Sequence, residues 1–337
     1  TPDVITGWNC NLYDIPYICR RIEKVLGEKW MRSLSPWNKV DMREVVIKGR
    51  TNLAYEVAGV TILDYLDLYQ KFTYTNQESY RLDHIAYVEL GQNKLDHSQF
   101  ENFKDFYTSD WQRFVEYNIQ DVNLVDRLED KMRLLELALT LAYDAKVNLS
   151  DVYSQVRMWD TLIYNDLKER NIVVPPKIST KKDDKYAGAY VKEPVPGVYD
   201  WVVSFDLNSL YPHLIMQYNI SPETLVDERF PGISVDKLLQ KEVTPNPEYC
   251  VCANGAQYRK DIHGFLPEIM QRIYDERKIY KGHMLDAKRD LEHAKTPAET
   301  LALQKSVSRF NNIQMARKIQ LNSAYGAIGN QYFRYYN

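Results

Sequence analysis

The stretch VVSFDLNSLYP (residues 202–212) joins an apolar, β-branched run to a helical pattern. Residues 201–205 predict a short buried strand, because the run is mostly apolar and rich in β-branched side chains. Asn208 or Ser209 is placed to cap a following helix through residues 214–218. The stretch therefore predicts a junction between a strand and a helix.

Asp206 lies at this predicted junction. Its carboxylate and the neighbouring carbonyl of Leu207 are oxygen ligands of the kind that Mg²⁺ prefers. An Asp at the end of a strand is also a common helix cap, which explains the residue without any chemistry. From these residues alone, both interpretations of Asp206 stay open.

Composition places the chain among globular proteins. Its 337 residues are 45% hydrophobic and 12% aromatic, which is enough for two or three packed domains. The longest apolar stretch, near residues 134–143, is too short and too interrupted to span a bilayer. The chain starts without Met and as if within a domain, so we interpret it as an excerpt of a longer protein.

Charge is distributed unevenly along the chain. The net charge is −3, but residues 264–337 contain 12 Lys and Arg against 7 Asp and Glu, which leaves −8 for residues 1–263. A basic section on an acidic body suits polyanion binding at one place, although a solvated helical surface gives the same pattern. The four cysteines lack C-x-x-C spacing, which predicts free thiols in a reducing compartment rather than a zinc site.

The first 70 residues predict a mixed fold. Residues 4–9 predict a strand that ends in a turn, and a helix follows from about Asp14. Asp14 is either an N-terminal helix residue or a metal ligand. Residues 45–57 predict a β-hairpin with its turn at 49–52.

Residues 60–68 predict another strand, with two acidic residues on it. Asp64 and Asp67 are three apart and would face opposite sides of a strand, so we interpret them as structural. Residues 111–139 predict a helix on which Tyr117 and Asp121 share a face.

Two helices are predicted near the C-terminus. Residues 264–294 form one pattern, in which Arg277 and Lys281 make a basic stripe while Lys278 points elsewhere. A turn at residues 296–297 precedes the second helix.

On that second helix, Lys318, Asn322 and Tyr325 are spaced i, i+4 and i+7 and therefore share one face.

These segments together resemble family B DNA polymerases. The pattern D-x-x-S-L-Y-P, which starts at Asp206, resembles motif A, and K-x-x-x-N-S-x-Y-G, which starts at Lys318, resembles motif B. T-G-W-N-x-x-x-Y-D-I-P-Y, which contains Asp14, resembles the Exo II motif. Tyr117-x-x-x-Asp121 resembles the Exo III motif.

The resemblance implies a 3′→5′ exonuclease site in the N-terminal part. Asp14 and Asp121 would bind metal ions, and the Tyr117 hydroxyl would orient the attacking water. The expected Exo I pair, Asp-x-Glu, does not precede Asp14 in this sequence. Two-metal hydrolysis needs enough carboxylates to hold both ions, so we expect little or no exonuclease activity from this chain.

The resemblance also implies a nucleotide site in the C-terminal part. Asp206 and Leu207 would bind the catalytic metal, Ser209 and Leu210 would contact the triphosphate through their backbone, and the Tyr211 ring would exclude a 2′-hydroxyl. The helix residues that would meet the dNTP are Arg277, Lys281, Lys318 and Asn322. The residues that would contact DNA are Tyr186 and Gly188, in a Tyr-x-Gly-Gly/Ala-like element, and Tyr325 and Gly326.

The implied fold class is α/β (α+β). The implied parts are an RNase H-like exonuclease domain (1–135), a connecting segment (136–177), the first part of an antiparallel palm sheet with helices (178–263), antiparallel two-helix fingers (264–330), and a return to the palm (331–337). Motif C, Asp-Thr-Asp, does not occur in the sequence.

We therefore expect part of a DNA-directed DNA polymerase of T-even-like phage type, which uses dNTPs and Mg²⁺, with Mn²⁺ as a substitute. Its expected partners are primer–template DNA, a polypeptide carrying the rest of the palm and thumb, an N-terminal domain and a sliding clamp, but no membrane. It would act in the cytoplasm of the infected bacterium. The alternatives are a DNA- and partner-binding subunit of a split polymerase and a stand-alone exonuclease.

Overall fold

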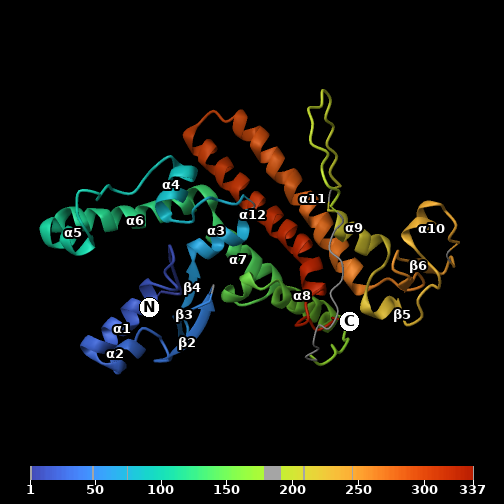
Figure 1. Cartoon of the computed structure of the whole chain (residues 1–337), viewed down its shortest axis with the longest axis horizontal. Coiled ribbons are helices and arrows are strands. Elements are labelled where there is room, and N and C mark those ends of the chain that lie inside the picture. Colours follow the sequence, from blue (N-terminus) through green and yellow to red (C-terminus); the bar gives the residue numbers. More distant parts are fainter. Residues whose placement is uncertain are drawn as a thin grey trace. The chain divides into compact units, whose positions relative to one another are not determined.

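A computed structural model of the chain describes residues 2–47, 49–73, 75–177, 191–207, 209–244 and 246–336 (Figure 1). Two compact units are present, one made of Thr1–Ala142 with Asn148–Tyr153 and the other of Tyr143–Val147 with Ser154–Asn337. Both units combine helices with small sheets, which confirms the α/β (α+β) class. The finer domain boundaries given above remain predictions.

The first unit contains one parallel strand pair and one hairpin. β1 (Val4–Gly7) is parallel to β4 (Thr61–Asp64). β2 (Val40–Ile47) and β3 (Arg50–Val57) form the predicted antiparallel hairpin. Their pairing continues closer to the turn than predicted, so the strands are longer and the turn is shorter than residues 49–52 suggested.

The predicted strand at residues 60–68 is wrong beyond Asp64. The Asp64 carboxylate accepts a hydrogen bond from the backbone N–H of Leu66, at 3.0 Å, and this N-terminal cap starts α3 (Tyr65–Phe72). Asp67 therefore lies on a helix, and the two carboxylates are not on opposite faces of a strand.

The other helices of this unit are α1 (Asp14–Leu26), α2 (Glu28–Arg32), α4 (Leu82–Leu90), α5 (Phe103–Ser109), α6 (Trp111–Met132) and the 3₁₀ helix η1 (Leu149–Tyr153), together with α7 (Leu134–Ala145), whose residues from Tyr143 onward belong to the second unit. The predicted helix at 111–139 is interrupted, because Arg133 has a left-handed backbone (φ 55°) that ends α6. α1 packs its buried side, including Ile15 and Cys19, against residues of the hairpin strands such as Tyr55.

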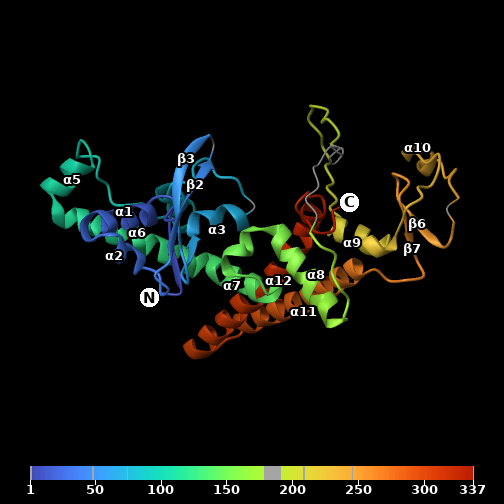
Figure 2. The same cartoon turned by 90° about the horizontal axis from the view of Figure 1, so that it is seen from below.

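The second unit is built around two long helices. Its elements are α8 (Gln155–Glu169), α9 (Leu210–Gln217), η2 (Pro222–Thr224), β5 (Leu225–Val226), α10 (Val235–Leu239), β6 (Tyr249–Val251), β7 (Gln257–Arg259), α11 (Phe265–Glu292) and α12 (Pro297–Ile328). β5, β7 and β6 form an antiparallel sheet in that order. α11 and α12 lie side by side as a helical hairpin in both views (Figures 1 and 2). The Thr296 hydroxyl accepts from the Glu299 N–H and caps α12, as the predicted turn requires.

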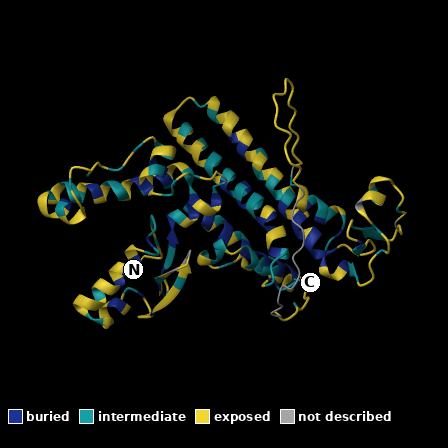
Figure 3. Ribbon diagram, viewed as in Figure 1, coloured by how far each residue is buried: buried dark blue, intermediate teal, exposed yellow. Residues whose placement is uncertain are grey.

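The strand predicted at residues 201–205 is not formed. Residues 191–207 have no regular structure and are exposed (Figure 3). The exposed fraction is 92% for Trp201 and 90% for Phe205. A strand is stable only when a neighbouring strand pairs with its backbone. Among the residues that the structure describes, none pairs with this run.

Trp159 anchors α8 to α12 in the core of the second unit. Its side chain is 1% exposed, and its indole N–H donates to the Gln320 carbonyl at 3.2 Å and to the Ser323 hydroxyl at 3.1 Å. The substitution Trp159→Phe removes this donor and leaves space in the core. We expect it to lower the free energy of unfolding by about 2 kcal/mol.

Trp201→Phe is the matched control for that prediction, because Trp201 is almost fully exposed. It should change the free energy of unfolding by less than about 0.5 kcal/mol. Urea unfolding followed by circular dichroism measures both variants. Equal shifts in the two midpoints would contradict the role given to Trp159.

Candidate active sites

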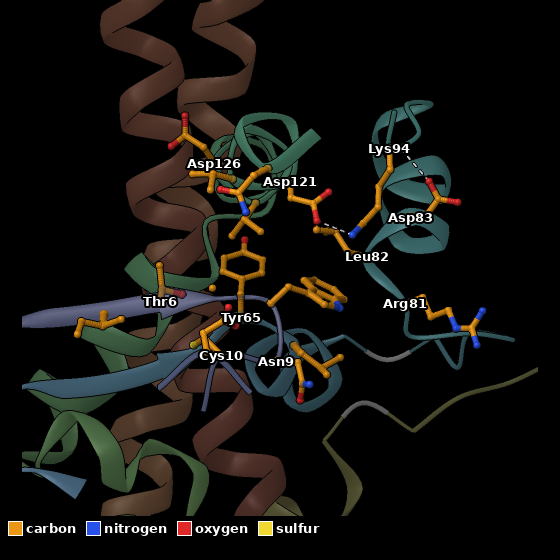
Figure 4. A pocket seen from close by; sticks show the side chains of 18 of the residues that line it. Thr6, Asn9, Cys10, Tyr65, Arg81, Leu82, Asp83, Lys94, Asp121 and Asp126 are labelled. Atoms are coloured by element: carbon orange, nitrogen blue, oxygen red, sulfur yellow. Dashed lines mark hydrogen bonds and ion pairs between the residues drawn. The ribbon is translucent and has the colours of Figure 1, made fainter. Parts of the chain in front are cut away.

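A cavity of about 1110 Å³ lies within the first unit (Figure 4). Its walls come from β1, the start of α1, the start of α4, the segment after α4, and α6. Three residues singled out in the sequence, Asp14, Tyr117 and Asp121, all line it. The fold thus brings the Exo II and Exo III resemblances to one place, although they are more than a hundred residues apart.

Asp64 stabilises the turn that precedes Asp14, the residue at the wall of this cavity. Its buried carboxylate accepts the backbone N–H groups of Asn9, at 2.8 Å, and Asn11, at 2.9 Å. Burial raises the pKa of Asp64, and these backbone hydrogen bonds oppose that rise. The structural interpretation of Asp64 is confirmed.

Asp14 is the first residue of α1 and is exposed. The N-cap position is Tyr13, and no side chain makes a capping hydrogen bond there, so Asp14 does not act as the cap of α1. Partial burial raises the pKa of Asp14, and the nearby charge of Asp64 raises it further. An exposed carboxylate of this kind at the cavity wall is available to a ligand.

Tyr117 and Asp121 lie on α6, one turn apart, as predicted. Lys94 was not singled out in the sequence, yet its ammonium donates to Asp121 Oδ2 at 2.6 Å and to the Tyr117 hydroxyl at 3.3 Å. Burial lowers the pKa of Lys94, but the hydrogen bond and charge of Asp121 outweigh it and leave that pKa raised. Asp121 Oδ1 is buried and has no hydrogen-bond partner among the described residues.

The described residues do not complete a metal site in this cavity. Nowhere in the described part of the chain do three His, Cys, Asp or Glu side chains gather closely enough to hold an ion. Asp14 and Asp121 are candidate ligands, and the half-satisfied carboxylate of Asp121 suits a cation. Two such groups are too few for a two-metal set.

The second unit brings the motif A segment to the two long helices. Ser209 has a left-handed backbone (φ 53°) and precedes α9, on which Leu210 and Tyr211 are exposed. Arg277 of α11 donates to the Ser209 hydroxyl at 3.4 Å. The rings of Tyr211 and Tyr325 stack with centroids 4.6 Å apart and planes at 7°. Four of the predicted nucleotide- and DNA-contacting residues thus meet.

The cationic residues on α11 and α12 follow the predicted stripes. Lys281 is exposed one turn beyond Arg277, while the Lys278 ammonium lies 5.8 Å from the centre of the Tyr274 ring. On α12, Lys318 is half-buried and Asn322 is exposed. The side of α12 that meets the core is formed by Gln320, Leu321, Ser323 and Ala324. Lys318, Asn322 and Tyr325 are not among the buried residues of α12, in agreement with the shared face predicted for them.

The remaining predicted site residues are Asp206, Leu207, Gly326, Tyr186 and Gly188. Asp206 and Leu207 are exposed in the segment before α9. A Cβ atom on Gly326 would lie 2.8 Å from the side-chain oxygen of Gln155, which is the end of a flexible side chain and can move aside, so packing against α8 does not by itself require glycine there. Tyr186 and Gly188 lie outside the described residues.

Arg317 is a second residue that the sequence did not reveal as important. Its guanidinium pairs with Asp144 at the end of α7 and, at 2.6 Å, with Glu276 of α11. Its side chain is 14% exposed. Arg317 thus holds the part of α12 that carries Lys318 in place. No local sequence pattern indicates its partner Asp144, which lies 173 residues away.

Comparison with known proteins agrees with this geometry. Residues 147–337 match the sequence model of DNA polymerase family B, and residues 1–85 match its exonuclease domain. The whole chain is 35% identical to a DNA-directed DNA polymerase of Escherichia phage RB69 and 32% identical to one of Enterobacteria phage T4. For the DNA polymerase delta catalytic subunit of Candida albicans, 97% of the chain matches with 31% identity.

The chain spans 41% of the length of each phage relative and 30% of the yeast protein. Within the described residues, no helix is both long and apolar enough to cross a membrane. The family B polymerase model covers more than half of the chain and includes both stripes and the segment before α9. The chain belongs to DNA polymerase family B.

Proposed function

We propose that this chain is the central part of a template-directed DNA polymerase of T-even-like phage type, acting in the cytoplasm of an infected bacterium. The observation that carries the proposal is the meeting of α9, α11 and α12, where Arg277 contacts Ser209 and Tyr211 stacks on Tyr325. This arrangement places the Arg277 guanidinium and the stacked rings of Tyr211 and Tyr325 beside the helical hairpin. Such a surface suits a nucleoside triphosphate.

In this proposal the chain's own residues bind and orient the nucleotide. Arg277, Lys281 and Lys318 neutralise the triphosphate, Asn322 and Tyr325 border the new base pair, and Tyr211 lies under the sugar. Each charge-assisted hydrogen bond to a phosphate is stronger than a neutral one, so the triphosphate is the part held most firmly. Tyr186, Gly188 and Gly326 are proposed to contact the template DNA.

Enzymes of this family generally depend on divalent metal ions. Asp206 and the Leu207 carbonyl are the ligands that this chain would offer to Mg²⁺ or Mn²⁺ at the polymerase site. No three His, Cys, Asp or Glu side chains gather closely among the described residues, so further metal ligands would come from the polypeptide that completes the palm. The proposed partners are primer–template DNA, a polypeptide that completes the palm, an N-terminal domain and a sliding clamp.

The cavity of the first unit supports a second function in the same protein. Asp14, Tyr117, Asp121 and Lys94 place carboxylates, a phenol and an ammonium around one space, which suits the 3′ end of a DNA strand. We propose that it is the exonuclease site of the complete enzyme. Carboxylates beyond Asp14 and Asp121 would be needed for efficient cleavage.

Nucleotide-dependent retention of DNA tests the polymerase proposal. The chain and a polypeptide that completes the palm are incubated together with a labelled primer–template, and the next correct dNTP is expected to slow DNA release, whereas the corresponding rNTP is not. In Tyr211→Ala, the rNTP is expected to slow release almost as well as the dNTP, because the ring no longer excludes the 2′-hydroxyl. Release that is unaffected by any nucleotide would contradict the proposed site.

A further inference from the structure

Lys94 reaches the cavity from a segment without regular structure, between Gly91 and Phe100. Its ammonium forms the ion pair with Asp121 and lies 5.2 Å from the centre of the Tyr117 ring. A long lysine side chain loses considerable rotamer freedom when it is held in one place. Something must therefore fix the backbone from which it extends.

Asp83 provides that fixed point. It lies in the first turn of α4, where the helix dipole favours a carboxylate. Its Oδ1 accepts the backbone N–H of Lys94 at 2.8 Å and the side-chain amide of Asn93 at 3.3 Å. Figure 4 shows Lys94 between Asp83 and Asp121, joined to the first carboxylate at its backbone and to the second at its ammonium.

Other contacts hold the same segment without bonding Lys94 itself, among them the packing of the His97 ring against Phe106 and Tyr117. Arg113 donates to the Asp96 carbonyl at 2.8 Å, and Arg127 donates to the Gln92 side chain. They fix the residues on either side. Asp83 bonds the amide of Lys94, so it determines where the Cα atom of the lysine lies.

We propose that Asp83 is a positioning residue that holds Lys94 so that its ammonium reaches Asp121 and Tyr117. The role in DNA cleavage that this would serve rests on the proposed exonuclease function. The carboxylate of Asp83 acts through the lysine backbone. Among the described residues, Asp121 Oδ1 has no hydrogen-bond partner while Oδ2 accepts from Lys94, so the position of the Lys94 ammonium determines the contact that this carboxylate makes.

Amine labelling of the native chain tests this proposal without any nuclease activity. Lys94 is protected from reductive methylation by its ion pair, and Asp83→Ala is expected to raise its labelling rate about tenfold. Asp83→Asn keeps Oδ1 as an acceptor and should restore a rate within about twofold of the unsubstituted chain. Mass spectrometry of peptides reports each lysine separately.

Asp96→Ala is the matched control. Asp96 is in the same segment, but its carboxylate bonds the amide and hydroxyl of Ser98 instead of Lys94. The labelling rate of Lys94 in the Asp96→Ala variant should equal that in the unsubstituted chain. An unchanged rate in Asp83→Ala, or an equal rise in Asp96→Ala, would overturn the proposal.

Binding of a single-stranded oligonucleotide separates this proposal from the exonuclease proposal. If Lys94 labelling changes as expected but Lys94→Ala and Tyr117→Ala leave oligonucleotide binding unchanged, Asp83 positions Lys94 and the exonuclease assignment of the cavity fails. If those two variants weaken binding while labelling is insensitive to Asp83, the positioning role fails alone.

Discussion

Lys318→Ala is expected to weaken dNTP binding about tenfold or more, whereas Lys278→Ala leaves it nearly unchanged. Lys318 lies on the same face of α12 as Asn322 and Tyr325, and Tyr325 stacks on Tyr211 at the start of α9. Loss of one charge-assisted contact to a phosphate costs about 1.5–3 kcal/mol, which is tenfold or more in affinity.

Lys278 is the control because it has the same charge and lies on the neighbouring helix. Its ammonium lies near the Tyr274 ring, on a different side of α11 from Arg277 and Lys281. The measurement is an equilibrium titration of the reconstituted enzyme with a fluorescent dNTP in the presence of primer–template. Equal losses in the two variants would mean that the charge of the helices in general, and not the α12 stripe, binds the nucleotide.

Arg317→Met is expected to lower the free energy of unfolding by about 3 kcal/mol at pH 7. The substitution leaves Asp144, whose side chain is 16% exposed, without its cation. Breaking a buried ion pair by removing one partner costs about 3–5 kcal/mol, because an uncompensated charge stays buried. Arg289→Met, which removes an exposed pair with Asp286, should cost less than about 1 kcal/mol.

The loss in Arg317→Met should shrink as the pH falls. Burial raises the pKa of Asp144, and Arg317 opposes that rise. Without the arginine, the pKa in the folded state rises further above the unfolded value near 3.8. The folded variant then binds a proton more tightly than the unfolded chain, so it is favoured at low pH and loses that advantage as the pH rises through the raised pKa.

Urea unfolding at pH 7 and near pH 4.5 measures this effect. A second variant, Arg317→Met with Asp144→Leu, should recover much of the stability at pH 7, because apolar groups of similar size replace the pair. A loss that is independent of pH, or that the double variant does not recover, would contradict the account of the Arg317 contacts.

Local signals in the sequence predicted the helical parts well. The two long helices carry their i, i+4 spacing in consecutive residues, so α11 and α12 and their basic stripes were predicted. The hairpin of β2 and β3 was found for the same reason, since its partners are adjacent in sequence. The family resemblance and the cavity residues Asp14, Tyr117 and Asp121 came from motifs.

Features that depend on distant partners were not predictable in this way. The run at 201–205 has the composition of a strand, but a strand also requires a neighbour, and none pairs with it among the described residues. Lys94 meets Asp121 across 27 residues, and Arg317 meets Asp144 across 173. No periodicity connects such pairs. The strand predicted at 60–68 ends early, at Asp64, because the Leu66 N–H donates a hydrogen bond to the Asp64 carboxylate and starts a helix there.

The most direct test of the central claim is primer extension by an enzyme reconstituted from this chain and a polypeptide that completes the palm. The account predicts that Asp206→Ala lowers dNTP incorporation about 1000-fold or more, since a metal-binding carboxylate at the reaction centre contributes several kcal/mol. Asp200→Ala, an exposed carboxylate in the same segment, should leave incorporation within about twofold. Equal activity of the two variants would contradict the placement of the polymerase site at Asp206.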